Sequence, residues 1–130
     1  MALQQLPGNE IGPASTSGNF DLSVGGWGTT TTPLSSSFGV FATVVGNNVL
    51  QNYGRIASPQ IDTLFTQAIA ELDDVKRAEL GNQIDRLIWE EGHSIPLYAR
   101  PGAAAVRATL ANFGAHGFAD IDFINAGYVK

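Results

Sequence analysis

The sequence contains no cysteine, which excludes disulfide bonds, thiolate catalysis and Cys-ligated zinc. Basic residues are also scarce: seven Lys and Arg stand against twelve Asp and Glu, for a formal net charge of −5. Because the seven are scattered, the chain lacks the electrostatic footprint of a protein that binds nucleic acid or an anionic membrane. The densest apolar run, residues 40–45, is too short to span a bilayer. The first six residues also lack the cationic and long apolar regions of an export signal.

The chain nevertheless has the apolar content of a folded domain. Its 130 residues are the length of one ordinary domain, and 44% of them are hydrophobic, which excludes a wholly disordered chain. Composition differs along the chain. Residues 1–55 hold nine of the fifteen glycines and three charged residues, whereas residues 56–91 hold eight acids and three bases. The character of the chain therefore changes near Ser58.

Helix signals dominate the second part. Ser58 followed by Pro59 predicts a helix start, because the serine oxygen can accept an orphan amide hydrogen bond and proline loses no bond there. This helix is expected to end near residue 71. Asp73 predicts the N-cap of a second helix over residues 74–91, with Gly92 as its C-terminal stop. Apolar residues at spacings of three and four predict one buried face on each helix: Ile61, Leu64, Phe65, Ala68, Ile69 and Leu72, then Leu80, Ile84, Leu87 and Ile88.

Strand signals are shorter. Apolar and polar residues alternate over residues 20–24, which predicts a half-buried strand that the following glycines end. Residues 94–98 predict a second short strand, and Pro96 restricts it to a sheet edge, a strand entry or a crossing point. Weaker strand patterns occupy residues 103–107 and 124–129.

Two stretches indicate irregular structure. The polar residues 29–37 predict a loop, with a short helical turn around residues 34–41. Residues 112–122, with Gly114 and Gly117, also indicate a loop.

An ordered succession of motifs runs through the chain: Phe20-Asp21-Leu22, Gly26-Trp27, Asn52-Tyr53-Gly54-Arg55, Ser58 to Leu64, Lys76-Arg77, Leu87 to Glu91, Ile95 to Gly102, Asn112-Phe113-Gly114 and Gly117-Phe118. This succession resembles the C-terminal end of the family 5 extracellular solute-binding proteins of ABC importers. That family is the peptide/nickel type, which includes the oligopeptide- and dipeptide-binding proteins. The resemblance covers roughly residues 18–130, and the order of the motifs is more specific than any one of them.

The resemblance implies an α/β fold. Family members look like two-lobed clamshells, several times longer than this chain, that enclose a ligand between the lobes. This chain would then be a partial lobe of a type II periplasmic-binding-protein fold, with a few-stranded mixed sheet and a helix pair. Residues 1–17 would be a poorly defined N-terminal segment, residues 18–94 a second-lobe segment, and residues 95–130 the hinge crossover and the return to the first lobe. Met1 would be an artificial or misassigned start, since the body of the first lobe, the export signal and the anchoring cysteine of many lipoprotein members are missing.

The same resemblance implies a transport function. The parent protein would capture a peptide or another small solute outside the cytoplasm, in the periplasm or anchored to the cell envelope, and deliver it to an ABC permease in the membrane. No cofactor, metal or nucleic acid is expected. An alternative from another class is a self-standing interaction module, because exposed strand edges and apolar surface would favour self-association.

Trp27 and Thr30 are the first candidate ligand contacts. Trp27 follows a predicted strand end, where α/β proteins place ligand contacts, and its indole offers an apolar face and one donor. The other interpretation, equally weighted, is that Trp27 covers the local core. In the peptide-binding members, an aspartate shortly after this tryptophan is implied to pair with the amino terminus of the ligand. Thr30 stands three residues on, and its hydroxyl replaces a charge-assisted bond with a weaker one. The departure favours another solute, or a peptide held differently.

Tyr53, Arg55 and Tyr98 are weaker candidates. Tyr53 and Arg55 could line the cleft, although a tyrosine packed in a turn and a solvated arginine are the favoured interpretations. Tyr98 lies beside the implied hinge, where a structural role is at least as well supported as ligand contact.

Catalysis has no positive support in the sequence. His93 follows a predicted helix C-terminus, where the helix dipole favours a histidine without any chemistry. His116 has no metal-ligand spacing to His93, and the acids of residues 73–91 suit a solvated helix face better than a paired-carboxylate site. Neither a nucleophile elbow nor a phosphate-binding loop with its lysine occurs. Trp89, next to the apolar stripe of the second helix, is predicted to be core.

Overall fold

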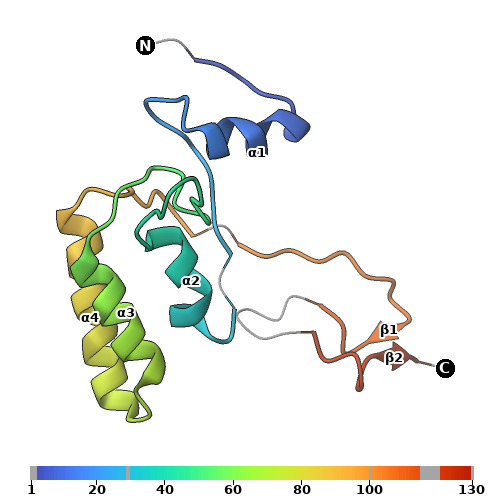
Figure 1. Cartoon of the computed structure of the whole chain (residues 1–130). Helices are drawn as coiled ribbons and strands as arrows, with labels where there is room; N and C mark the ends of the chain where they lie inside the picture. The colour runs from blue at the N-terminus through green and yellow to red at the C-terminus, as the bar shows by residue number, and fades with distance from the viewer. Residues whose placement is uncertain (1–2, 29, 100, 115–120, 130) are drawn as a thin grey trace.

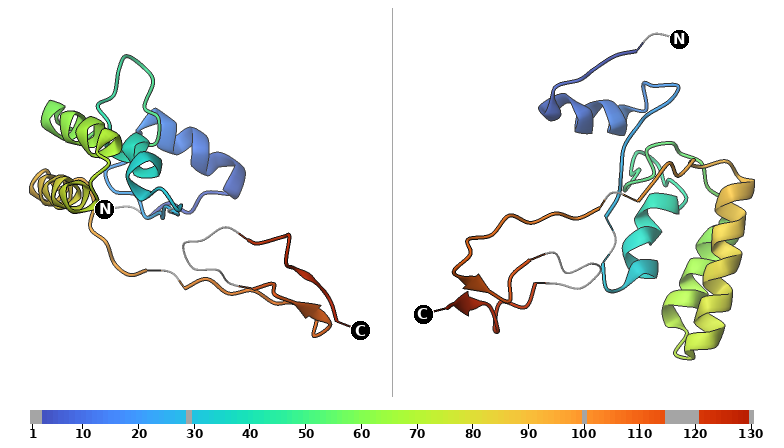
Figure 2. Two further views of the ribbon diagram at one scale, coloured as in Figure 1. Left: turned by 90° about the horizontal axis from the view of Figure 1, so that it is seen from below. Right: turned by 180° about the vertical axis from the view of Figure 1, so that it is seen from behind.

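The computed structural model describes residues 3–28, 30–99, 101–114 and 121–129. The helices α2, α3 and α4 pack side by side, α1 lies apart from them, and the C-terminal third extends away as an arm that ends in a small two-stranded sheet (Figure 1). The two further views show the same arm leaving the helices (Figure 2). The described part is therefore helix-rich, with a minor β component compatible with a partial α/β domain.

The helix pair forms as its local signals predict. Helix α3 spans Pro59–Ala70, and the Ser58 hydroxyl oxygen accepts a hydrogen bond from the Ile61 amide at 3.4 Å. Helix α4 spans Asp74–Glu90, and the Asp73 carboxylate accepts hydrogen bonds from the amides of Val75 and Lys76. Gly92 ends α4 with a φ of +64, which glycine adopts without strain. Caps and stop are therefore confirmed.

The core lies where α2, α3 and α4 meet. Helix α2 spans Pro33–Phe41, close to the predicted helical turn around residues 34–41, and it includes the second half of the stretch 29–37 that was predicted to be a loop. The rings of Phe38 and Phe41 pack on Phe65 of α3, with centroids 5.6 Å and 6.2 Å away. The buried centre and the apolar side chains packed on it are Ile61, Leu64, Phe65, Ala68 and Ile84, with Leu34, Phe38, Phe41, Leu80, Leu87 and Ile88 around them.

Three apolar residues predicted to be buried on the helix pair face solvent instead. Leu72 is 92% exposed and Ile69 is also exposed. Ile69 lies in the last turn of α3 and Leu72 just after the helix, and neither belongs to the core cluster. Trp89 is 54% exposed and lies outside the core cluster, although the preceding Ile88 packs against that cluster. The prediction of Trp89 as core was therefore wrong.

Helix α1 spans Gly8–Ser17, within the N-terminal segment where the sequence predicts no element. None of its residues is buried. Its C-terminus instead meets Arg55, whose Nη2 donates a hydrogen bond to the Thr16 carbonyl at 2.8 Å. Gly18 follows with a φ of +70, and a Cβ there would lie 1.8 Å from Arg55 Nη1. The positive φ therefore favours glycine here, and a larger residue would also displace the Arg55 guanidinium.

The strand predictions fail except at one place. Residues 20–24, 94–98 and 103–107 have no strand structure, and most of their apolar side chains are exposed. Alternation indicates one buried face, but a strand forms only where a neighbour accepts and donates the ladder hydrogen bonds. For these segments the described residues contain no such neighbour. They run as extended, unpaired chain.

The sheet that forms is antiparallel and small, not the mixed sheet that the family resemblance implies. Strand β1, Leu110–Ala111, pairs with β2, Gly127–Tyr128, and Leu110 lies opposite Tyr128. Strand β2 falls inside the predicted 124–129 stretch, whereas β1 was not predicted. The described residues of the 112–122 stretch form the expected loop, while Gly117, Phe118 and His116 lie outside the described residues, as do Met1, Thr29 and Arg100.

Candidate functional site

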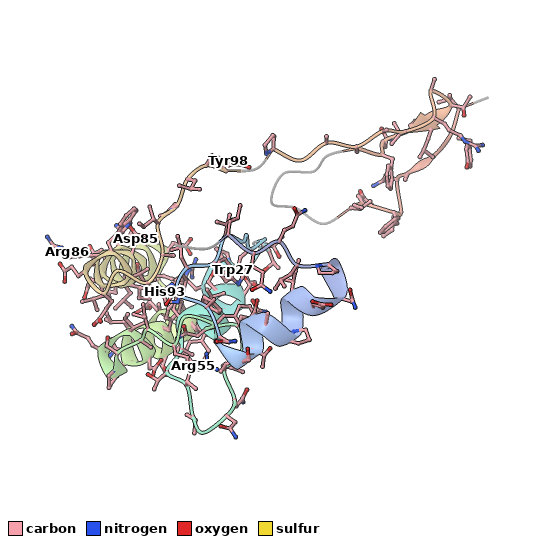
Figure 3. The ribbon with its side chains drawn as sticks, turned by 90° about the horizontal axis from the view of Figure 1, so that it is seen from above. Trp27, Arg55, Asp85, Arg86, His93 and Tyr98 are labelled. Carbon is pink, nitrogen blue, oxygen red and sulfur yellow. The ribbon has the colours of Figure 1, made fainter. Side chains whose placement is uncertain are left out.

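The four predicted ligand contacts lie on three different segments. Trp27 and Thr30 belong to the chain between α1 and α2, Tyr53 to the loop between α2 and α3, and Tyr98 to the extended segment after α4. Figure 3 shows Trp27 near the helices and Tyr98 out along the arm. Trp27 is 50% exposed and Tyr98 is 79% exposed. Both aromatic faces are therefore accessible to a solute or to another part of a larger protein.

Thr30 forms a local turn before α2. Its Oγ1 accepts a hydrogen bond from the Thr32 amide at 3.2 Å and lies 3.2 Å from Thr32 Oγ1. Pro33 then begins the helix. The segment thus presents neutral hydroxyls and amides near a helix N-terminus, with no carboxylate among residues 22–41.

Arg55 fixes the loop that carries Tyr53. Its Nη1 donates to the Tyr53 carbonyl at 3.3 Å, beside the Nη2 bond to Thr16. Tyr53 is half-buried, while Arg55 has the positive φ of +55. Arg55 therefore has a structural role here, because it donates a hydrogen bond to the C-terminal end of α1 from a loop that is distant in sequence.

A surface depression of about 490 Å³ lies beside this contact. Its walls come from α1 and the loop before α3, and they are Pro13, Thr16, Ser17, Gly46, Asn47, Val49 and Arg55. None of the four predicted contacts lines it. The depression and the candidate contacts are thus different places on the chain.

Among the described residues, a buried hydrogen-bond network is centred on Asn52. This side chain is fully buried, and its Nδ2 donates to the carbonyls of Ala42 and Ile56, both at 2.9 Å. Its Oδ1 lies 3.1 Å from His93 Nε2, which also lies 3.1 Å from the Val40 carbonyl. Sequence reasoning missed Asn52, although it opens the Asn-Tyr-Gly-Arg motif, because its partners are distant in sequence.

His93 has the structural role that the sequence favours. It follows α4 directly, and its ring packs edge-on against Phe41 with centroids 4.7 Å apart. Burial lowers the pKa of His93 below its usual value by disfavouring the charged form, and the hydrogen bond to the Val40 carbonyl opposes this shift. His93 is therefore part of the packing around Asn52.

The acidic residues of α4 form the solvated face that was predicted. Arg77 pairs with Asp74, and Arg86 Nε lies 3.5 Å from Glu90 Oε1 at an exposed position. Throughout the described ranges, no three His, Asp or Glu side chains gather where they could hold a metal ion. None of the helices in the described part combines the length and apolar character needed to cross a bilayer.

Comparison with known proteins identifies the relatives of this chain. No protein-family model matches it. It is 46% identical over 113 residues to the oligopeptide-binding protein OppA of Mycobacterium tuberculosis and to that of Mycobacterium bovis. The match covers 87% of this chain but only 18% of OppA. A probable deoxycholate-binding periplasmic protein of Escherichia coli, YgiS, is 27% identical over 117 residues, which are 90% of this chain and 21% of that protein.

The chain therefore spans about a fifth of the length of the curated relatives it matches. The identity extends over most of the chain. The resemblance read from those motifs is confirmed: over most of its length, this chain is similar to part of OppA, an oligopeptide-binding protein.

Proposed function

We propose that this chain is part of a solute-binding protein that captures peptides or related solutes outside the cytoplasm and delivers them to an ABC permease. The observation that carries the proposal is the 46% identity to OppA over 113 residues. A binding role without catalysis agrees with that relationship. The rival hypothesis of a self-standing interaction module gains no support from the comparisons.

The proposal assigns the chain to a partial lobe of a periplasmic-binding-protein fold. Residues 18–94 would belong to the second lobe, residues 95–130 to the hinge crossover and the return to the first lobe, and residues 1–17 to a separate N-terminal segment. Such proteins work by differential affinity, because only the closed state lets both lobes contact the solute. The exposed, extended segments 20–24 and 94–98 support this assignment. Within the described residues their backbone donors and acceptors have no strand partner, so they are available to strands of a longer protein.

Trp27, Thr30, Tyr53 and Tyr98 are the proposed solute contacts. Trp27 and Tyr98 offer exposed aromatic faces, and Thr30 offers a hydroxyl near the start of α2. Half-buried Tyr53 is the least accessible of the four. A solute held by these groups is recognised through apolar area and neutral hydrogen bonds, without a carboxylate for a free amine.

The solute class follows from the same residues. A peptide held away from its amino terminus satisfies this chemistry, and so does an apolar solute with hydroxyl groups. The relationship to a probable deoxycholate-binding protein supports keeping solutes other than peptides in the class.

A chimera tests the proposed contacts. The 113 residues of Mycobacterium tuberculosis OppA that match this chain are replaced by those of this chain, and binding of a mixture of short peptides is measured by calorimetry. Trp27→Ala is expected to weaken binding by about tenfold or more, as loss of a buried aromatic contact does. Trp89→Ala removes the other exposed tryptophan and is expected to leave the affinity unchanged.

Equal affinities for the two variants would contradict the assignment of Trp27. If the chimera without either substitution fails to bind peptides while OppA itself binds them, the placement of this chain in a solute-binding protein would be contradicted.

A further inference from the structure

His93 lies at the point where α4 ends and the extended segment 94–99 begins. Its backbone amide donates to the Ile88 carbonyl at 3.4 Å, and its Nε2 lies 3.1 Å from both the Val40 carbonyl and Asn52 Oδ1. The ring thus joins the end of α4 to the end of α2 and to the 42–58 segment.

The orientation of Asn52 fixes the proton on this ring. Because Asn52 Nδ2 donates to the carbonyls of Ala42 and Ile56, its Oδ1 must face His93. Nε2 then faces two acceptors, the Asn52 Oδ1 and the Val40 carbonyl. Only an Nε2–H can satisfy them, so neutral His93 carries its proton on Nε2 and leaves Nδ1 bare.

The other ring nitrogen, Nδ1, lies in a different environment. It is buried, and no hydrogen-bond partner for it exists among the described residues. The Phe41 ring covers the imidazole from one side. A proton on Nδ1 would create a buried N–H donor without an acceptor, together with a positive charge in a partly apolar site.

The surroundings offer little compensation for that charge. Helix α2 contains no titratable residue, and none of the charged groups on the neighbouring elements has a hydrogen bond or ion pair to the ring within the described part of the chain. Those groups and the titratable tyrosines nearby are Tyr53 and Arg55 in the 42–58 segment, Asp62 at the start of α3, Arg86, Glu90 and Glu91 at the end of α4, and Tyr98 beyond it.

We propose that His93 is an acid-sensitive latch. In its neutral form it holds the end of α4, and with it the start of the segment 94–99, against α2 and the 42–58 segment. A proton taken from solvent by Nδ1 weakens that attachment. The proposal does not depend on the solute-binding function, because it rests on contacts within this chain alone.

The direction of the pH effect follows from burial, which lowers the pKa of His93. Between the lowered folded-state pKa and the higher pKa of the unfolded chain, the unfolded state binds more protons than the folded state. Stability therefore rises with pH across this window. The contribution of the latch is complete above about pH 6.5 and is lost as the pH falls toward the folded-state pKa.

Urea unfolding of the 130-residue chain at about pH 7.5 and about pH 5 tests the latch. The folding equilibrium constant is expected to drop several-fold at the lower pH. His93→Gln keeps a donor near the Nε2 position but cannot titrate, so its drop is expected to be clearly smaller. His116→Gln, which removes the other histidine of the sequence, is the matched control and is expected to behave like the wild type.

An NMR titration of the wild-type histidines gives an independent readout that does not require the variant to fold. It is expected to show the pKa of His93 below the ordinary value of about 6.5. A pKa at or above that value would overturn the latch, and so would a His93→Gln drop as large as that of the wild type.

Discussion

At the scale of single residues, the buried side chain of Asn52 connects parts of the chain that are distant in sequence. Its amide and carbonyl join three separate places, Ala42, Ile56 and His93, at distances of 2.9 to 3.1 Å. Because the side chain is fully buried, its removal leaves these partners in a site away from bulk solvent. Asn52 therefore positions the loop between α2 and α3 and, through His93, the end of α4.

Asn52→Ala is expected to lower the free energy of unfolding by about 2–4 kcal/mol, because it leaves buried carbonyls and the His93 Nε2–H without partners. Urea unfolding monitored by circular dichroism measures the change. Asn47→Ala, an exposed asparagine of the same loop, serves as the control and is expected to stay within about 0.5 kcal/mol of the wild type. A similar loss of unfolding free energy in the two variants would show that the buried hydrogen bonds of Asn52 do not stabilise the chain more than an exposed asparagine does.

Residues with local partners were predictable, and those with distant partners were not. Ser58 and Asp73 cap amides two or three residues away, so their sequence neighbours reveal their roles. Asn52 bonds partners up to 41 residues away, and Arg55 reaches 39 residues back to Thr16. Both belong to the Asn-Tyr-Gly-Arg motif, yet the family resemblance gave no reason for them.

At the scale of elements, the helices α3 and α4 followed from the sequence, whereas α1 and most of the strands did not. The apolar spacing that predicts α3 and α4 can be read within each segment, and a helix forms its backbone hydrogen bonds within itself. A strand depends on a neighbour that another part of the chain must supply. The 20–24 and 94–98 segments have the composition of strands and remain unpaired in the described structure.

Helix α4 gives a prediction at this scale. Asp73→Ala removes the acceptor for the Val75 and Lys76 amides and is expected to destabilise the chain by about 1 kcal/mol. Asp73→Asn keeps an oxygen in the same place and loses only the charge, so its effect should be smaller. Thermal unfolding of the two variants measures the difference. An alanine variant as stable as the asparagine variant would show that the cap is not formed in solution.

At the scale of the whole molecule, many of the exposed apolar side chains lie outside the helices. The large exposed ones on the early extended chain and on the arm include Leu22, Val24, Trp27, Ile95, Leu97, Tyr98, Phe123, Ile124 and Tyr128. Exposed apolar surface of this kind commonly marks a contact with a partner. A chain that spans 18% of its OppA relatives has such a partner in the rest of a longer protein, according to the proposed function.

The most direct test of the account is one calorimetric titration, in which the same mixture of short peptides is added to the 130-residue chain and to its chimera with OppA. The chimera is expected to bind, and the chain alone to bind weakly or not at all, because only the longer protein can contact a solute from both sides. Binding by the isolated chain as tight as that of the chimera would contradict the account and would make these 130 residues a complete receptor.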